Sequence, residues 1–131
     1  MLTPTEIRTI ARARLQDAAT LLRARRCDGA IYLCGYAVEL VLKARICDTL
    51  NWSGYPSTKA EFQQYQSFKT HDLDILLHLS GSESEIKKVH LAEWSAVAKW
   101  DPEARYKPIG SASVKDATLM IVSARKLMRA L

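Results

Sequence analysis

The sequence has few of the residues that break or cross-link a chain, with four prolines, five glycines and three cysteines among 131 residues. It also has no apolar run of the roughly 18 to 20 residues needed to cross a bilayer. The first residues, MLTPTEIRTIARAR, lack the apolar core of a signal peptide. These absences predict a cytoplasmic protein that makes no membrane contact.

Metal and cofactor chemistry have little support in the residue pattern. The cysteines, Cys27, Cys34 and Cys47, are odd in number, and two lie in one apolar segment, which is typical of small buried side chains rather than a disulfide framework. No Cys or His pair has the spacing of a zinc site. No glycine-rich phosphate loop is present, so we expect neither a metal nor a cofactor.

Length and composition indicate a single globular domain over residues 1–131. A chain of this length can build one proper core but not two. Its 48% hydrophobic and 25% charged residues exclude the low-hydrophobicity, high-charge class of disordered proteins.

The net charge of +5 is concentrated at the two ends of the chain. Residues 1–26 carry six arginines and two acidic side chains, and residues 113–131 carry four basic side chains and one acidic. The middle, residues 27–112, has nine basic and eleven acidic side chains. If the two end segments pack side by side, they form a basic face that permits a polyanion partner such as RNA. The alternative is an ordinary solvated surface.

Apolar residues recur at helical spacing almost throughout, and no strand-like alternation is present. The pattern predicts an all-α, up-down bundle of four main helices plus a short helix. Thr70 and Ser113 are the expected N-caps of the third and last helices, and Asp28 that of the second. The expected helices cover residues 5–26, 28–50, a short piece within 60–69, 70–79, 82–100 and 113–128.

The stretch YLCGYAVELVLKARIC, residues 32–47, is the most apolar part of the chain yet keeps four polar groups on one line. At about 100° per residue they occupy a stripe roughly 60° wide, and the rest of the surface is almost wholly apolar. We therefore expect a central helix whose stripe opens on a groove or subunit interface, with Gly35 admitting a neighbouring backbone. The four groups are Tyr32, Tyr36, Glu39 and Lys43.

Two interpretations of the stripe remain open at this point. In the structural one, Glu39 and Lys43 form an i, i+4 ion pair and the tyrosines pack with their hydroxyls outward. In the functional one, the stripe lines a site with polar residues from elsewhere in the chain. Its best companions are Lys69, His71 and Asp72 in SFKTHDLD, and Arg105 and Tyr106 in WDPEARY.

The order of these residues resembles the HEPN domain, the small helical module named for higher eukaryotes and prokaryotes nucleotide-binding proteins. The most specific part is YAVELVLKA, residues 36–44, followed by the HDL of residues 71–73. The resemblance implies a bundle of four to five helices that commonly dimerises. It also implies nucleotide or RNA binding, a toxin and antitoxin or defence setting with a minimal nucleotidyltransferase partner, and in active members metal-independent RNA cleavage.

One departure separates the chain from active HEPN ribonucleases, which have an Arg followed four to six residues later by His. No arginine has that spacing to His71, His78 or His90. His71 as acid or base and Arg105 as phosphate cation are the candidates that remain, provided that the fold brings them together. The alternative for His71 is a helix-start histidine held by its neighbours.

Three hypotheses follow from these residues. The first is a nucleotide- or RNA-binding HEPN module, the second a ribonuclease using His71 and Arg105, and the third a dimeric interaction module whose stripe is structural. In the first two, Tyr32, Tyr36, Glu39, Lys43, Lys69, Asp72 and Tyr106 would contact the ligand. Trp94 and Trp100 are expected in the core, whereas Trp52 is the tryptophan better placed to contact a ligand or partner.

Overall fold

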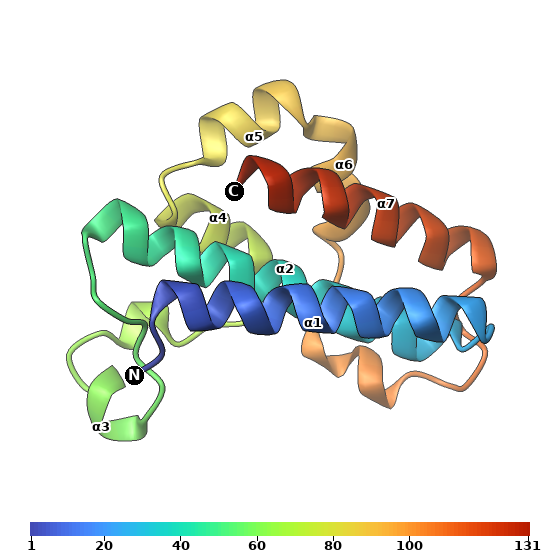
Figure 1. Cartoon of the computed structure of the whole chain (residues 1–131), viewed down its shortest axis with the longest axis horizontal. Coiled ribbons are helices and arrows are strands. Elements are labelled where there is room, and N and C mark those ends of the chain that lie inside the picture. The colour runs from blue at the N-terminus through green and yellow to red at the C-terminus, as the bar shows by residue number, and fades with distance from the viewer.

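Helices supply almost all the regular structure in the computed structural model, which describes residues 1–131 (Figure 1). The all-α prediction is confirmed, and the only extended pairing is an isolated bridge between Leu2 and Tyr55. No helix is both long and apolar enough to span a membrane. The elements are α1 Pro4–Arg23, α2 Cys27–Leu50, α3 Lys59–Phe62, α4 Leu73–Leu79, α5 Glu83–Val89, α6 Leu91–Val97 and α7 Val114–Ala130, with 3-10 helices at Gln66–Phe68 and Pro102–Tyr106.

Reciprocal caps fix the starts of the first and last helices. The hydroxyl of Thr3 accepts from the backbone N–H of Glu6 at 3.2 Å, and the Glu6 carboxylate accepts from the N–H of Thr3 at 2.8 Å. Ser113 and Asp116 repeat this arrangement, so the predicted N-cap of α7 is confirmed. The first helix ends at Arg23, three residues earlier than predicted, because Arg25 takes a left-handed conformation with φ of 58°.

The long helix α2 is the centre of the molecule, as predicted. It packs against α1, α7, α4 and the 3-10 helix Pro102–Tyr106. Figure 1 shows α1 crossing in front of α2, with α7 beside them. Buried alanines on the α1 face toward α2, Ala11 and Ala18, permit the close approach of these two helices. One continuous cluster of buried side chains joins all the long helices.

Two predictions about α2 itself are wrong. Asp28 is not its N-cap, because the helix already begins at Cys27; the Asp28 carboxylate instead accepts from the backbone N–H groups of Gly110 and Ala112. Gly35 admits a side chain rather than a backbone. A Cβ atom at Gly35 would lie 2.2 Å from Cγ of Trp100, so the indole ring occupies the space that a side chain would fill.

The segment predicted as one helix over residues 82–100 is two helices that meet at His90. The backbone of His90 leaves helical geometry, with φ of −125° and ψ of 36°. The break changes the direction of the chain. As a result, α6 packs on α7 and buries Trp94 and Val97. Val89, which lay on the expected inner face of the single helix, is 63% exposed.

The predicted N-cap of the third main helix is wrong, because α4 is capped by Asp72 rather than Thr70.

The connection from α2 to α4 closes over one end of the helices. Backbone hydrogen bonds pair Leu2 with Tyr55 in both directions, and Gly54 permits this because a Cβ atom there would lie 2.8 Å from the Leu2 carbonyl oxygen. An aromatic cluster fills the connection, formed by Trp52, Tyr55, Phe62, Tyr65 and Phe68. Trp52 therefore packs within the fold, against Phe68 with ring centroids 4.9 Å apart.

Candidate functional site

A half-open cavity of about 290 Å³ lies where the connection meets the C-terminal half of α2. Its apolar wall includes Leu40 and Phe62, and the start of α1 contributes Ile7. Four of the predicted site residues, from two distant segments of the sequence, meet here. The polar side chains that line the cavity are Tyr36, Lys43, Tyr55, Ser57, Lys69, Thr70 and His71.

A buried carboxylate organises this cavity. One oxygen of Glu39 lies 2.9 Å from Nδ1 of His71, and the other accepts from Nζ of Lys43 at 3.0 Å. The Glu39 side chain is 1% exposed, whereas that of His71 is 63% exposed. A buried carboxylate is tolerated because both of its oxygens have charged or polar partners. The predicted i, i+4 pair is therefore present, and His71 extends it.

Local hydrogen bonds at the start of α4 hold His71 against α2. The hydroxyl of Thr70 accepts from the backbone N–H of Asp72 at 3.1 Å, and the Asp72 carboxylate accepts from the N–H of Ile75 at 3.1 Å. These two bonds fix the backbone on one side of His71. The carboxylate of Asp72, a predicted ligand contact, is therefore used to cap a helix.

Two phenols complete the polar lining. Burial, followed by the nearby Glu39 carboxylate, raises the pKa of the half-buried Tyr36 hydroxyl. Burial likewise raises the pKa of Tyr55, whose hydroxyl donates to the carbonyl of Phe68 at 2.6 Å. Nζ of Lys43 lies 5.4 Å from the centroid of the Tyr55 ring, a cation–π contact. Both phenols stay protonated at neutral pH, so the Tyr36 hydroxyl is available to donate to a ligand.

No pattern in the sequence indicates that Tyr55 belongs to the site. It lies in the irregular NWSGYPSTK segment, where no periodicity indicates which side chains turn inward. Its burial to 3% exposure follows from the pairing of its backbone with Leu2.

Arg105, Tyr106 and Tyr32 lie elsewhere. Arg105 and Tyr106 belong to the 3-10 helix Pro102–Tyr106, and neither lines the cavity. The Arg105 guanidinium lies over the Tyr106 ring at 4.9 Å, and hydrogen bonding to Tyr106 and then to Tyr32 raises its pKa. In Figure 1 this short orange segment lies below α1, well to the right of α3.

The four stripe residues of α2 therefore do not share one site. Tyr32 and Lys43 face the same direction, but at 1.5 Å per residue they are about 16 Å apart along the helix axis. Tyr32 packs near Trp100, with ring centroids 6.3 Å apart, whereas Lys43 belongs to the cavity. The structure brings together Tyr36, Glu39, Lys43, Lys69 and His71, and it leaves Arg105 outside this group.

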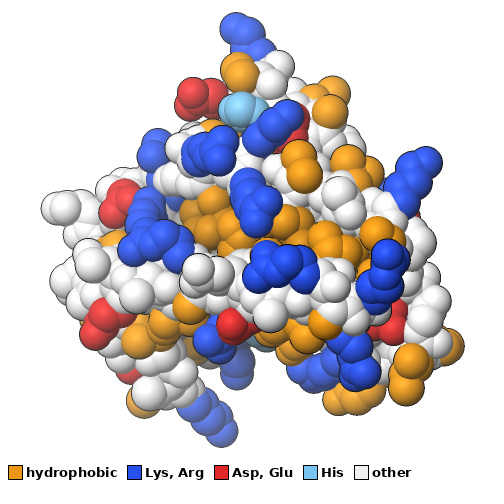
Figure 2. All heavy atoms as spheres, turned by 45° about the vertical axis from the view of Figure 1, so that its right-hand side comes forward, with side chains coloured by type: hydrophobic (Ala, Val, Ile, Leu, Met, Phe, Trp, Pro, Cys, Tyr) orange, Lys and Arg blue, Asp and Glu red, His pale blue; other side chains and the backbone are white.

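The two basic ends of the chain pack against each other, which meets the condition for the basic face that the charge distribution left open. A groove of about 330 Å³ runs between α1 and α7, lined by Arg8, Arg12, Arg125 and Arg129. Its floor is apolar, made by Leu15, Val41 and Met128. Figure 2 shows basic side chains around this apolar hollow. Arg8 also pairs with Asp48 at 2.8 Å, while no carboxylate pairs with the other three arginines.

The other residues considered as candidates are either buried in the core or lie on the surface away from the cavity. Trp94 and Trp100 are buried, as predicted, with 3% and 8% exposure. The His78 side chain is 76% exposed and lies 3.5 Å from Glu83. No group of three or more His, Cys, Asp or Glu side chains is arranged to hold a metal ion. Burial raises the pKa of the Cys34 thiol to about 12 and that of Cys47 to about 11, so neither is a thiolate at neutral pH.

Comparisons with protein-family models, with curated proteins and with solved structures find no match for this chain.

Proposed function

We propose that the chain binds ribonucleotide phosphate, either free or within an RNA strand, in the cavity around His71. The observation that carries the proposal is the convergence of Lys69, His71 and the Tyr36 hydroxyl on one half-open cavity with an apolar wall. A phosphate needs cations and hydrogen-bond donors, and a nucleobase needs an apolar or aromatic surface. This cavity offers both, with Phe62 and Leu40 on the apolar side.

The charges around Glu39 leave positive charge for a ligand. Lys43 is held by Glu39 at 3.0 Å and is only 16% exposed, so its charge balances that carboxylate. Lys69 makes no ion pair and remains free to meet a phosphate. His71 uses Nδ1 toward Glu39, which leaves Nε2 for the ligand.

The arginine groove supports the RNA form of this proposal. The helix α1 contributes Ile7 to the cavity and Arg8 and Arg12 to the groove. A strand that places one nucleotide in the cavity can cross α1 and lay further phosphates along the arginines. Such binding is driven by release of counterions and falls steeply with salt.

We further propose that the chain is an HEPN-like bundle, that it forms a homodimer, and that it works with a minimal nucleotidyltransferase in a toxin and antitoxin or defence system. The support is the order of Tyr36, Glu39, Lys43 and His71 along the sequence, together with an all-α fold. Mass measurement of the purified protein tests the dimer, and co-purification with a nucleotidyltransferase encoded beside it tests the partner.

Fluorescence anisotropy with a labelled single-stranded RNA tests the binding site. We expect Lys69→Gln to weaken binding roughly tenfold, because it removes a charge-assisted contact, and to reduce the salt slope by about 0.7. Lys88→Gln is the matched control, because it removes the same charge from exposed α5, outside every described cavity. Equal losses in the two variants would mean that only overall charge matters, and the proposed site would be wrong.

The hydrogen bond from His71 to Glu39 favours a second candidate, a metal-independent ribonuclease. The buried carboxylate holds the tautomer that carries its proton on Nδ1, so Nε2 can accept the proton of a ribose 2′ hydroxyl. The 2′ oxygen then forms a bond to phosphorus while the bond to the 5′ oxygen breaks, and that oxygen takes a proton from the protonated His71. Lys69 would stabilise the phosphate in place of Arg105.

RNA cleavage in the presence of EDTA tests this second candidate. His71→Ala should abolish cleavage, and Arg105→Gln should leave it within about twofold, because Arg105 lies outside the cavity. Cleavage that survives in His71→Ala would exclude this mechanism.

A further inference from the structure

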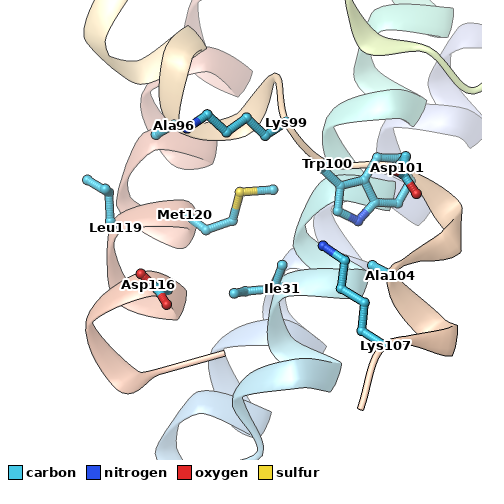
Figure 3. A pocket seen from close by; sticks show the side chains of 10 residues that line it. All are labelled: Ile31, Ala96, Lys99, Trp100, Asp101, Ala104, Lys107, Asp116, Leu119 and Met120. Carbon is cyan, nitrogen blue, oxygen red and sulfur yellow. The ribbon is translucent and has the colours of Figure 1, made fainter. Parts of the chain in front are cut away.

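The groove between α1 and α7 differs in charge from the cavity beside Trp100. The groove has a volume of about 330 Å³, and none of the residues that line it is acidic. The cavity beside Trp100, of about 200 Å³, is lined by two lysines and two aspartates, so its charges balance (Figure 3). Those four residues are Lys99, Lys107, Asp101 and Asp116. Of these two hollows, only the groove can select an anionic partner by charge.

Three of the four arginines in the groove have no acidic partner within the chain. Arg8 is held internally, because its guanidinium donates to Asp48 at 2.8 Å. Arg12, Arg125 and Arg129 are exposed and form no ion pair. The groove therefore presents three positive charges that the protein itself does not neutralise.

The free arginines lie on both sides of an apolar floor. Arg12 belongs to α1, whereas Arg125 and Arg129 belong to α7 and lie one turn apart. Figure 2 shows the apolar hollow with basic side chains around it. The floor is formed by Leu15, Val41 and Met128. A partner that fits this groove carries an apolar strip with anionic groups on both sides of it.

An amphipathic helix with acidic flanks has this pattern. Its apolar side chains at i, i+3, i+4 and i+7 form a stripe, and glutamate or aspartate side chains on either side of the stripe can face both walls of the groove. A single RNA strand carries its phosphates along one backbone. When its bases cover the floor, that backbone meets one wall and leaves the arginines of the other wall without anions.

No helix of this chain offers such a pattern, so a second copy does not fit the groove. Only α5 has two acidic residues in its first turn, Glu83 and Glu85. Its next turn carries Lys87 and Lys88, which would repel the arginines of the groove. The large apolar residue between them, Ile86, is buried and cannot cover the floor. The partner is therefore another protein.

We propose that the groove docks an acidic amphipathic helix of a partner protein. The apolar stripe of that helix covers the floor, and its carboxylates form ion pairs with Arg12, Arg125 and Arg129. Docking there occupies the arginines that an RNA strand leaving the His71 cavity would contact, so the partner blocks the path of the RNA. This blocking rests on the proposed function, whereas the docking itself does not.

Fluorescence anisotropy with a labelled synthetic peptide tests the docking. The peptide is held helical by a hydrocarbon staple and has leucines at i, i+4, i+7 and i+11, flanked on both sides by glutamates. Two control peptides replace all the leucines by serine or all the glutamates by glutamine. We expect each control to bind at least tenfold more weakly, because apolar burial and charge both contribute. Equal binding of the serine peptide would mean that charge alone matters, and it would overturn the proposal.

Variants of the arginines locate the docking site. The double variant Arg125→Gln, Arg129→Gln should weaken peptide binding roughly tenfold, because it removes two ion pairs at the edge of the groove. The matched control, Lys87→Gln, Lys88→Gln, removes two like charges from exposed α5, outside the groove, and should leave binding within about twofold. Equal losses in the two double variants would show that the peptide does not dock in the groove.

Displacement of labelled RNA by the unlabelled peptide tests the blocking. We expect the peptide with leucines and glutamates to release the RNA, whereas the glutamine peptide should not. RNA that stays bound beside the docked peptide would overturn the blocking. A peptide that fails to bind, while Arg125→Gln, Arg129→Gln weakens RNA binding, would assign the groove to RNA alone. If instead the peptide docks and Lys69→Gln has no effect on RNA, the docking stands and the proposed RNA site is wrong.

Discussion

The two halves of α2 differ in how the buried polar groups beside them are hydrogen-bonded. In the C-terminal half, Glu39 is 1% exposed and both its oxygens have partners, His71 and Lys43. In the N-terminal half, the Trp100 indole rests on Gly35 with its N–H buried and unpaired. The C-terminal half holds a buried carboxylate whose hydrogen bonds are satisfied by two side chains. The N-terminal half holds an aromatic ring that packs on a glycine. The difference indicates that the first end depends on paired charges, whereas the second depends on the close fit of an aromatic ring.

The largest expected effect comes from opening the network at Glu39. Lys43→Met leaves a buried carboxylate with His71 as its sole partner, and we expect a loss of about 3 kcal/mol in the free energy of unfolding. Urea unfolding at neutral pH measures it. Lys88→Met on exposed α5 is the control and should change stability by less than about 0.5 kcal/mol. A similar small change in both variants would show that the Glu39 network adds no stability.

A side chain placed at Gly35, where the Trp100 indole packs, should have the next largest effect on stability. Gly35→Ala forces Trp100 to move, at a cost of about 1–3 kcal/mol, of which about 1 kcal/mol is offset by better helix propensity. Gly29→Ala in the same helix is the control, since its Cβ atom would meet only the flexible end of Leu21 at 3.2 Å. Thermal unfolding and tryptophan emission should both respond to Gly35→Ala. A stability gain in both variants would mean that the Trp100 indole is not tightly packed on Gly35.

Removing the exposed member of the network should cost less. His71→Ala leaves one Glu39 oxygen without its partner, and we expect a loss of about 1 kcal/mol because the position lies near solvent. Urea unfolding at neutral pH measures the loss, and Lys88→Ala on exposed α5 is the control. An equal change in both variants would show that the contact of His71 with Glu39 adds no stability.

The smallest expected effect concerns the loop that Asp28 holds at the start of α2. Hydrogen bonds from Gly110 and then Ala112 lower the pKa of Asp28, so this stabilisation is present above the ordinary value of 3.8 and is lost as pH falls through the lower folded value. Asp28→Asn should therefore speed amide exchange at Gly110 and Ala112 at pH 7. The difference in thermal stability between the variant and the parent should shrink below pH 3.8. A difference that is constant with pH would exclude the carboxylate as its cause.

Much of the secondary structure could be predicted because it depends on local pattern. The 3.6-residue spacing of apolar side chains located α1, α2 and α7, and Ser113 marked the start of α7. The break at His90 could not be predicted, because nothing near it is a Gly or Pro. It is decided by the packing of α6 on α7, a contact between distant parts of the chain.

The candidate site shows the same division. The spacing of Glu39 and Lys43 guarantees that they meet on a helix, whatever surrounds them. The contact of His71 with Glu39 joins residues 32 positions apart. It depends on where α4 begins beside α2, which is a tertiary contact. The spacing along the helix already places Tyr32 about 16 Å from Lys43, but it does not tell which distant side chains each of them contacts.

The sequence by itself determined an all-α chain with a central apolar helix, a polar stripe, an i, i+4 ion pair and basic ends. These depend on periodicity and on neighbours within one helical turn. The tertiary structure alone decided which polar groups share a cavity, that Arg105 stays apart from His71, and that the ring of Trp100 fills the space at Gly35. The physical reason is that burial and long-range contact depend on how helices pack, and the energy of a buried polar atom is set by partners that the local sequence does not contain.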